Sequence, residues 1–221
     1  MDLKLKICGM KDPGNVKKIA ALAPDYLGFI FYERSPRFVE EVILLQDEKI
    51  RKTGVFVDAS EDFILEKLVK YGLSAVQLHG DESPQVCRGL KNAILERNLK
   101  VELIKVFSVG EDFNFDLLRS YEKEVDFFLF DTKGKNKGGN GVSFNWEILK
   151  NYNSDIPFFL SGGIGPQDLP QIKELYSYFS KNGRKNLFYA LDVNSRFELS
   201  PGLKNEEQLR TFKNELLEEK I

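Results

Sequence analysis

The feature that most constrains the fold of this chain is a repeated pattern: a short apolar run, a polar or glycine-rich loop, then a helical stretch. Consecutive runs start between 21 and 32 residues apart, as in Thr53 to Ser74 and Val125 to Pro157. Such an interval holds one strand, one loop and one helix, which is the βα unit. The predicted strands begin near Leu3, Tyr26, Thr53, Ser74, Val101, Val125, Pro157 and Leu187.

Eight units predict an α/β fold, namely a (β/α)₈ TIM barrel that forms a single domain over residues 1–221. An open doubly wound sheet would use the same units and is the alternative. Apolar runs such as 26–31 and 127–130 suit parallel strands that helices cover on both faces. Helices are predicted over 62–71, after Ser83-Pro84, after Gly165-Pro166 and over 205–217.

Bulk composition excludes several classes of protein. A formal net charge of −2 gives no general attraction to nucleic acid or to an anionic membrane. Cys8 and Cys87 lie far apart without CxxC spacing, so neither a disulfide framework nor a metal site is expected. The N-terminus has no signal-peptide core, and no apolar stretch approaches the roughly 20 residues of a membrane span. We therefore expect a cytoplasmic protein with a small-molecule ligand. The sequence does not determine the oligomeric state, and a monomer is slightly favoured.

In a barrel of this kind the carboxyl ends of the strands carry the active site. The predicted seventh and eighth strands are followed by Leu160–Gly165 and Asp192–Ser195. Barrels often bind phosphate between these two loops, because glycines let backbone N–H groups approach an anion closely. We therefore predict a phosphate site that includes Gly162 and Gly163; the alternative is a tight turn that only begins a helix.

Asp131 follows four apolar residues, 127–130, at the end of the predicted sixth strand. Loss of hydration there favours the protonated carboxyl, which is the form that a general acid needs. The alternative is an Asp that caps the following loop with its own side chain. The glycine-rich segment 133–141 favours a functional role, since it is typical of a mobile lid over an active site.

Cys8 ends the predicted first strand beside Gly9 and is a candidate general base. A thiol has an ordinary pKa of about 8.5, so it needs help from its surroundings to act as a base. Small buried cysteines in strands are usually inert, and we assign that role to Cys87. His79, the sole histidine, is expected to support the site as part of the pocket wall. Arg37 is a candidate bidentate clamp for a substrate carboxylate.

Several motifs, spread over the whole chain in the same order, are similar to those of the phosphoribosylanthranilate isomerase family. They are Lys6–Met10, Gly28–Tyr32 with Ser35–Arg37, Gly54–Val57, Val76–Gly80, Phe130–Thr132 with Gly138–Gly141, Leu160–Ile164, and Asp192–Ser195. The resemblance implies a cofactor-independent isomerisation in tryptophan biosynthesis, an Amadori rearrangement of N-(5-phosphoribosyl)anthranilate.

The resemblance also implies a role for each matching residue. Asp131 would be the general acid and Cys8 the general base. Contacts to the anthranilate part would come from Arg37 and Asp192, and the phosphate would be held by Gly162, Gly163, Asn194 and Ser195. Three positions depart from the family pattern: Glu33-Arg34 replaces Pro-Lys, Asn140 replaces Thr or Ser, and Arg196 stands where many members have glycine. If that glycine has a positive φ, Arg196 would be strained there. Either the turn differs or the guanidinium adds to phosphate binding.

Other functions fit the same fold. A metal-dependent epimerase would need a cluster of ligands that one histidine does not provide. An indole-forming synthase would need a Lys and a Glu at strand ends, and only Lys105 is so placed. A non-catalytic module that binds a phosphorylated ligand is the third alternative, which the presence of both Cys8 and Asp131 disfavours.

Overall fold

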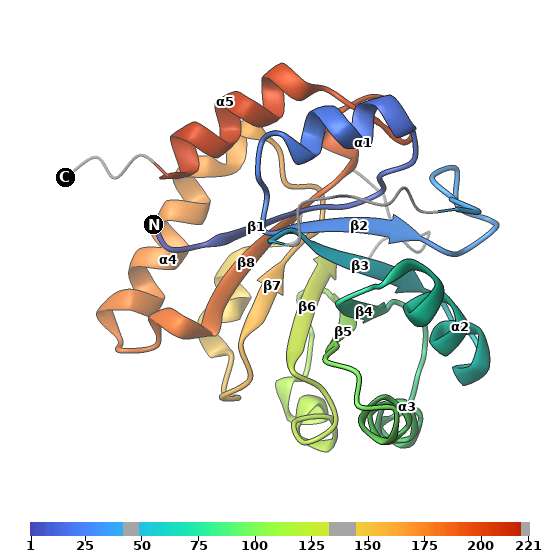
Figure 1. Ribbon diagram of the computed structural model, residues 1–221. Helices are drawn as coiled ribbons and strands as arrows, with labels where there is room; N and C mark the ends of the chain where they lie inside the picture. The colour runs from blue at the N-terminus through green and yellow to red at the C-terminus, as the bar shows by residue number, and fades with distance from the viewer. Residues whose placement is uncertain (42–48, 133–144, 218–221) are drawn as a thin grey trace.

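The computed structural model describes residues 1–41, 49–132 and 145–217, in which eight parallel strands close into a barrel (Figure 1). Each strand pairs with the next along the chain, and β1 also pairs with β8. The strands are β1 (Lys4–Ile7), β2 (Tyr26–Ile30), β3 (Arg51–Phe56), β4 (Ala75–Leu78), β5 (Glu102–Val109), β6 (Phe127–Thr132), β7 (Phe158–Leu160) and β8 (Phe188–Val193). All begin within two residues of the predicted positions, so the closed barrel is confirmed and the open sheet is excluded.

Helices surround the barrel where the sequence carries helix signals (Figure 1). Ser60 and Ser83 cap α2 and α3, each accepting a hydrogen bond from the backbone N–H three residues later. The helices are α1 (Pro13–Ala20), α2 (Glu61–Tyr71), α3 (Pro84–Glu96), α4 (Leu169–Lys181) and α5 (Glu206–Leu217). Between β8 and α5 lie a 3₁₀ turn, η5 (Ser195–Phe197), and the antiparallel pair β9 (Glu198–Ser200) and β10 (Leu203–Lys204).

The expectation of a helix in every interval is wrong in part. Short 3₁₀ helices, η1 (Phe115–Ser120) and η2 (Trp146–Asn151), follow β5 and β6, and the described residues between β2 and β3 contain no helix. In η1 and η2 the buried anchors are spaced three apart, Phe115 with Leu118 and Trp146 with Leu149. A three-residue repeat aligns side chains in a 3₁₀ helix, so one tight turn already buries both anchors.

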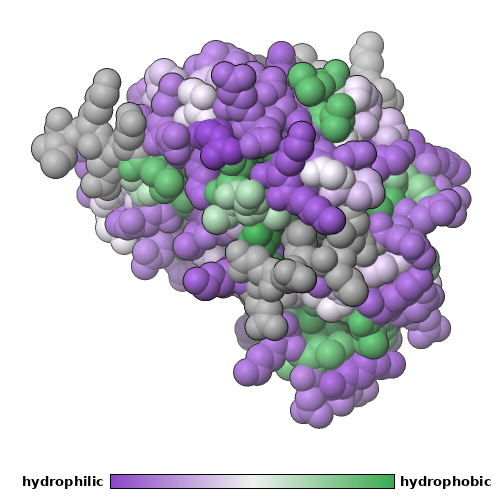
Figure 2. Space-filling model, turned by 45° about the horizontal axis from the view of Figure 1, so that its top comes forward, coloured by the Kyte–Doolittle hydropathy of each residue, from purple (hydrophilic) through white to green (hydrophobic). Residues whose placement is uncertain are grey.

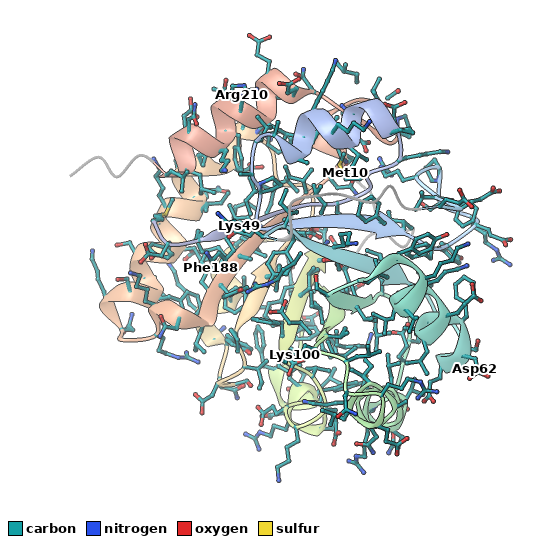
Figure 3. All side chains as sticks on the ribbon, in the orientation of Figure 1. Met10, Lys49, Asp62, Lys100, Phe188 and Arg210 are labelled. Atoms are coloured by element: carbon teal, nitrogen blue, oxygen red, sulfur yellow. The ribbon has the colours of Figure 1, made fainter. Side chains whose placement is uncertain are left out.

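Strand alternation divides the core into two parts. Leu5 and Ile7 of β1 face the helices, whereas Lys6 and Cys8 face the barrel interior. Side chains from every strand fill the space inside and around the barrel; Figure 3 labels Phe188, which begins β8. The apolar part of the interior consists of Tyr26, Ala75, Ile104, Val106, Leu129, Phe159 and Ala190.

The molecular surface in Figure 2 is mostly hydrophilic, with separate hydrophobic areas. Over the described residues, every helix is too short or too polar to cross a bilayer.

Candidate active site

Because the strands are parallel, their carboxyl ends meet at one end of the barrel, here called the mouth. Cys8 follows β1, His79 follows β4, and Asp131 and Asp192 lie near the ends of β6 and β8. The Cys8 N–H donates to the carbonyl of Val193, the residue after Asp192, at 2.9 Å, and the Asp131 Oδ2 lies 3.5 Å from the His79 Nε2. The structure therefore brings the candidate acid and the candidate base to the same mouth, as predicted.

Cys8 lies deeper than its position at a strand end suggested, with 4% of its surface exposed. Gly28 of β2 makes this packing work, because a Cβ on Gly28 would lie 2.8 Å from the Cys8 Sγ. Burial raises the pKa of the Cys8 thiol, whereas the positive charge of Lys6 opposes that shift. Cys87 is buried in α3, as expected of a core residue, and burial raises its pKa to about 11.

Beneath the thiol, Lys6 and Asp192 form a buried ion pair. The Lys6 Nζ lies 2.8 Å from the Asp192 Oδ1, and the two residues are register partners on neighbouring strands. Burial alone would lower the pKa of Lys6, but Asp192 and Cys8 together hold it above its ordinary value. Lys6 is therefore a charged ammonium, and one oxygen of Asp192 is already engaged inside the protein.

Asp131 is mostly covered, with 14% of its side chain exposed. Its role as a general acid stays a prediction. Its Oδ1 accepts a hydrogen bond of 2.8 Å from the Thr132 N–H, and its Oδ2 lies 3.5 Å from the His79 Nε2. The His79 Nδ1 is 3.2 Å from the Gln77 Nε2, so His79 is held as part of the wall.

Arg37 does not project freely into the mouth. Its Nε and Nη2 donate to the Glu198 carboxylate of β9 at 2.9 and 2.7 Å, a bidentate pair. The Lys204 Nζ donates to the same carboxylate at 2.7 Å and to the Asn194 Oδ1 at 2.6 Å. Although burial would raise the pKa of Glu198, Arg37 and Lys204 hold it below its ordinary value. The hairpin after β8 thus fixes both the candidate carboxylate clamp and one residue of the predicted phosphate loop.

The two loops predicted to bind phosphate are neighbours, since β7 pairs with β8. Gly162 and Gly163 have φ values of +91° and +76°, which strongly favour glycine. A Cβ on Gly162 would lie 2.3 Å from the Thr132 Oγ1, so the β7 loop packs directly on the end of β6. The roles of these glycines, and of Asn194 and Ser195, in binding phosphate stay predictions.

Arg196 lies in η5, and its φ is not positive: among described residues other than glycine, Ala23, Asp58 and Asn98 have positive φ. The turn therefore differs from one that requires glycine, and Arg196 carries no left-handed strain. The predicted lid, 133–141, and Asn140 within it lie outside the described residues.

Lys105 is held in a buried ion pair with Glu82. Its Nζ contacts the Glu82 Oε2 at 3.0 Å and the Gly80 carbonyl at 2.9 Å. Glu82 also accepts hydrogen bonds from the N–H groups of Asp58 and Gly80. Both charged side chains are buried. This pair braces the loops after β3 and β4, so it is not the open Lys and Glu arrangement of a synthase.

Sequence comparison identifies the family. The model of the family described as N-(5'-phosphoribosyl)anthranilate (PRA) isomerase matches residues 5–215. This chain belongs to the phosphoribosylanthranilate isomerase family. The family member from Parabacteroides distasonis is 40% identical over 219 residues, covering 96% of this chain and 93% of that protein. The member from Phocaeicola vulgatus is 37% identical over 212 residues, covering 96% and 97%.

Solved structures of the family share the fold. The phosphoribosylanthranilate isomerase from Thermus thermophilus has a TM-score of 0.76 at 24% identity, and that from Thermotoga maritima has 0.75 at 25%. Both alignments cover 97% of this chain and 98% of the other. A 3-hexulose-6-phosphate synthase also matches, with a TM-score of 0.59 at 11% identity. The barrel alone therefore does not select the isomerase chemistry.

Three charged residues of this family member were not predicted to belong to the site: Lys6, Glu198 and Lys204. Lys6 had a detectable signal, because a strand places residues i and i+2 on the same face and so puts Lys6 beside Cys8. Glu198 and Lys204 lie in a hairpin beyond the last strand, where no periodic pattern points into the barrel. Their contribution depends on how the chain folds back over the mouth.

Proposed function

We propose that this chain catalyses the isomerisation of N-(5'-phosphoribosyl)anthranilate to 1-(2-carboxyphenylamino)-1-deoxyribulose 5-phosphate in tryptophan biosynthesis. By reaction type this is an intramolecular oxidoreductase that converts an aldose into a ketose. The observation that carries the proposal is the placement of Cys8 and Asp131 at one mouth, in a chain that matches the family over residues 5–215. Action in the cytoplasm and a monomeric state are predictions from the sequence.

In the first step Asp131 donates a proton to the furanose ring oxygen. The bond between C1 and that oxygen breaks, and the nitrogen lone pair forms a C=N bond, which gives a protonated Schiff base. Asp131 suits this role because its carboxyl borders the solvent-facing mouth and has an oxygen 3.5 Å from the His79 Nε2. His79 would support the carboxyl as it gives up its proton.

In the second step the Cys8 thiolate removes the proton from C2. The C–H electron pair becomes the C1=C2 bond of an enolamine, and the C=N electrons return to nitrogen. The enolamine then gains a proton at C1 and loses the one on the C2 hydroxyl, which yields the ketone. Protons and electrons balance within the substrate, so the reaction requires no redox cofactor.

The substrate carries an anion at each end, a carboxylate on the anthranilate part and a phosphate on the sugar, and each would have its own binding residues. Arg37 would contact the anthranilate carboxylate with the part of its guanidinium that lies outside the bidentate pair with Glu198, and Asp192 would contact the same part of the substrate. Gly162, Gly163, Asn194 and Ser195 would hold the phosphate at the β7 and β8 loops. A solved family member, with a TM-score of 0.72 at 23% identity, is described in complex with reduced 1-(o-carboxyphenylamino)-1-deoxyribulose 5-phosphate.

The direct test is turnover of the fluorescent substrate by the purified protein. We expect the substrate signal to decay at a rate proportional to enzyme concentration, with the ketone as product. A protein that binds the substrate stoichiometrically without forming product would instead be a binding module. Complementation of a tryptophan auxotroph that lacks this step provides an independent test.

A further inference from the structure

A buried positive charge lies directly below the candidate base. Lys6 is fully buried in the barrel interior, two residues before Cys8 on the same face of β1. Its positive charge favours the thiolate form of Cys8. A fully buried ammonium is costly unless it has partners, and Asp192 at 2.8 Å supplies one.

The charged groups around Cys8 come from three elements: Lys6 from β1, Asp192 from β8 and Lys204 from β10. Gly28 from β2 contacts the thiol but brings no charge. Lys204 is bonded to Glu198 and Asn194 rather than to the thiol. Lys6 is therefore the cation that lies on the same strand face as Cys8, and its fixed counter-ion, Asp192, sets its position.

We propose that Lys6 is a positioning residue for Cys8: its ammonium, oriented by Asp192, stabilises the Cys8 thiolate that removes the C2 proton. This inference deepens the proposed function and rests on it for the role of the thiolate. Asp192 then acts first on Lys6, through the oxygen that the ammonium already occupies, and contacts the substrate only through the rest of its carboxylate.

The arrangement has a physical reason. Burial disfavours a thiolate, and a nearby opposite charge favours it. Burial raises the pKa of Cys8 and Lys6 opposes the rise, so removal of the ammonium leaves the charge of Lys204 to oppose burial and the Asp192 carboxylate. The loss of Lys6 therefore raises the pKa of Cys8, and the thiolate forms only at higher pH.

The test is a pH titration of the thiolate by its ultraviolet absorbance, which needs no reagent to reach the buried sulfur. Each protein is compared with its own Cys8→Ser version, so that the difference reports Cys8 alone. We expect Lys6→Met to raise the Cys8 midpoint by about 1–3 pH units. The kcat/KM at neutral pH should fall about tenfold per pH unit of that shift and recover as the pH rises.

Two further variants keep the test decisive. In Lys6→Met/Asp192→Asn no unpaired buried charge is left, so thermal stability should exceed that of the single variant while the midpoint stays above wild type. Lys105→Met/Glu82→Gln removes another buried lysine–carboxylate pair, one without contact to Cys8, and should leave the Cys8 midpoint unchanged.

The proposal would be overturned if the Cys8 midpoint stayed at its wild-type value in Lys6→Met or in Lys6→Met/Asp192→Asn. It would also be overturned if Lys105→Met/Glu82→Gln shifted the Cys8 midpoint as much as Lys6→Met does. The titration uses no substrate, so a wild-type protein without isomerase turnover would refute the proposed function and leave the influence of Lys6 on the thiol measurable.

Discussion

The two ends of the barrel interior are both polar, yet they differ in how fully their polar groups are paired. At the amino-terminal end, the Arg51 Nη1 donates to the Tyr26 Oη at 2.5 Å, and the Tyr26 hydroxyl donates to the Glu102 Oε2 at 2.9 Å. Tyr189 joins this network, and the Tyr26 ring packs edge-on against Phe159. Burial raises the pKa of Tyr26 well above its ordinary value, which leaves it a neutral hydroxyl.

At the mouth, Arg37 and Asp192 are held in ion pairs, but Asp131 keeps bonding capacity beyond the hydrogen bond from the Thr132 N–H. Asp131 retains solvent contact, and the loop glycines hold positive φ values beside it. Polarity by itself therefore does not identify the active end of a barrel. Completed networks add stability, whereas groups left with spare donors or acceptors are available to a substrate.

Asp131→Asn removes the proton donor and preserves the shape of the side chain. We expect kcat to fall roughly 10²–10⁴-fold, the usual contribution of a positioned general acid. Steady-state kinetics with a circular-dichroism control for folding measures this loss. Turnover near wild type would remove Asp131 from the mechanism.

Cys8→Ser replaces the thiol by a far weaker acid, so little of the base is formed. We expect a loss of kcat of roughly the same order as for Asp131, with the fold retained. In the wild type, kcat/KM should rise with pH through a midpoint above the ordinary thiol range, because the thiolate is the active form and burial raises its pKa. An unaffected rate in Cys8→Ser would make the thiol a core residue like Cys87.

Arg37→Ala should mainly raise KM, because the guanidinium is expected to bind the ground state and the transition state alike. Glu198→Gln retains Arg37 but weakens its bidentate support, so it should raise KM less than Arg37→Ala does. Initial rates over a range of substrate concentrations separate KM from kcat. A large loss of kcat at constant KM would contradict this assignment for either residue.

Tyr26→Phe tests the opposite end of the barrel and should leave catalysis intact. Deleting the hydroxyl leaves Arg51 and Glu102 short of a partner, so we expect the free energy of unfolding to fall by about 1–3 kcal/mol. Chemical denaturation measures the loss, and kcat/KM should match wild type. A catalytic defect as large as that of Asp131→Asn would abolish the distinction between the two ends.

The local parts of this structure were predictable because local rules determine them. Apolar runs predicted the starts of all eight strands to within two residues. Serine caps and amphipathic patterns predicted the positions of the helices α2, α3 and α5. The same rules placed Cys8 and Asp131 at strand ends, and parallel strands bring those ends together. The 3₁₀ segments after β5 and β6 were missed because a three-residue spacing of buried anchors resembles part of a helical pattern.

From the sequence alone follow the barrel, the family and the places of Cys8 and Asp131 at strand ends. The depth of Cys8, the exposure of Asp131 and the partners of Arg37 and Lys6 depend on how the strands pack together. Burial and pairing are properties of several strands at once: Lys6 and Asp192 are 186 residues apart in the chain, yet their charges lie 2.8 Å apart. Electrostatic interactions depend on distance in space and on the surrounding dielectric, and closure of the barrel sets both.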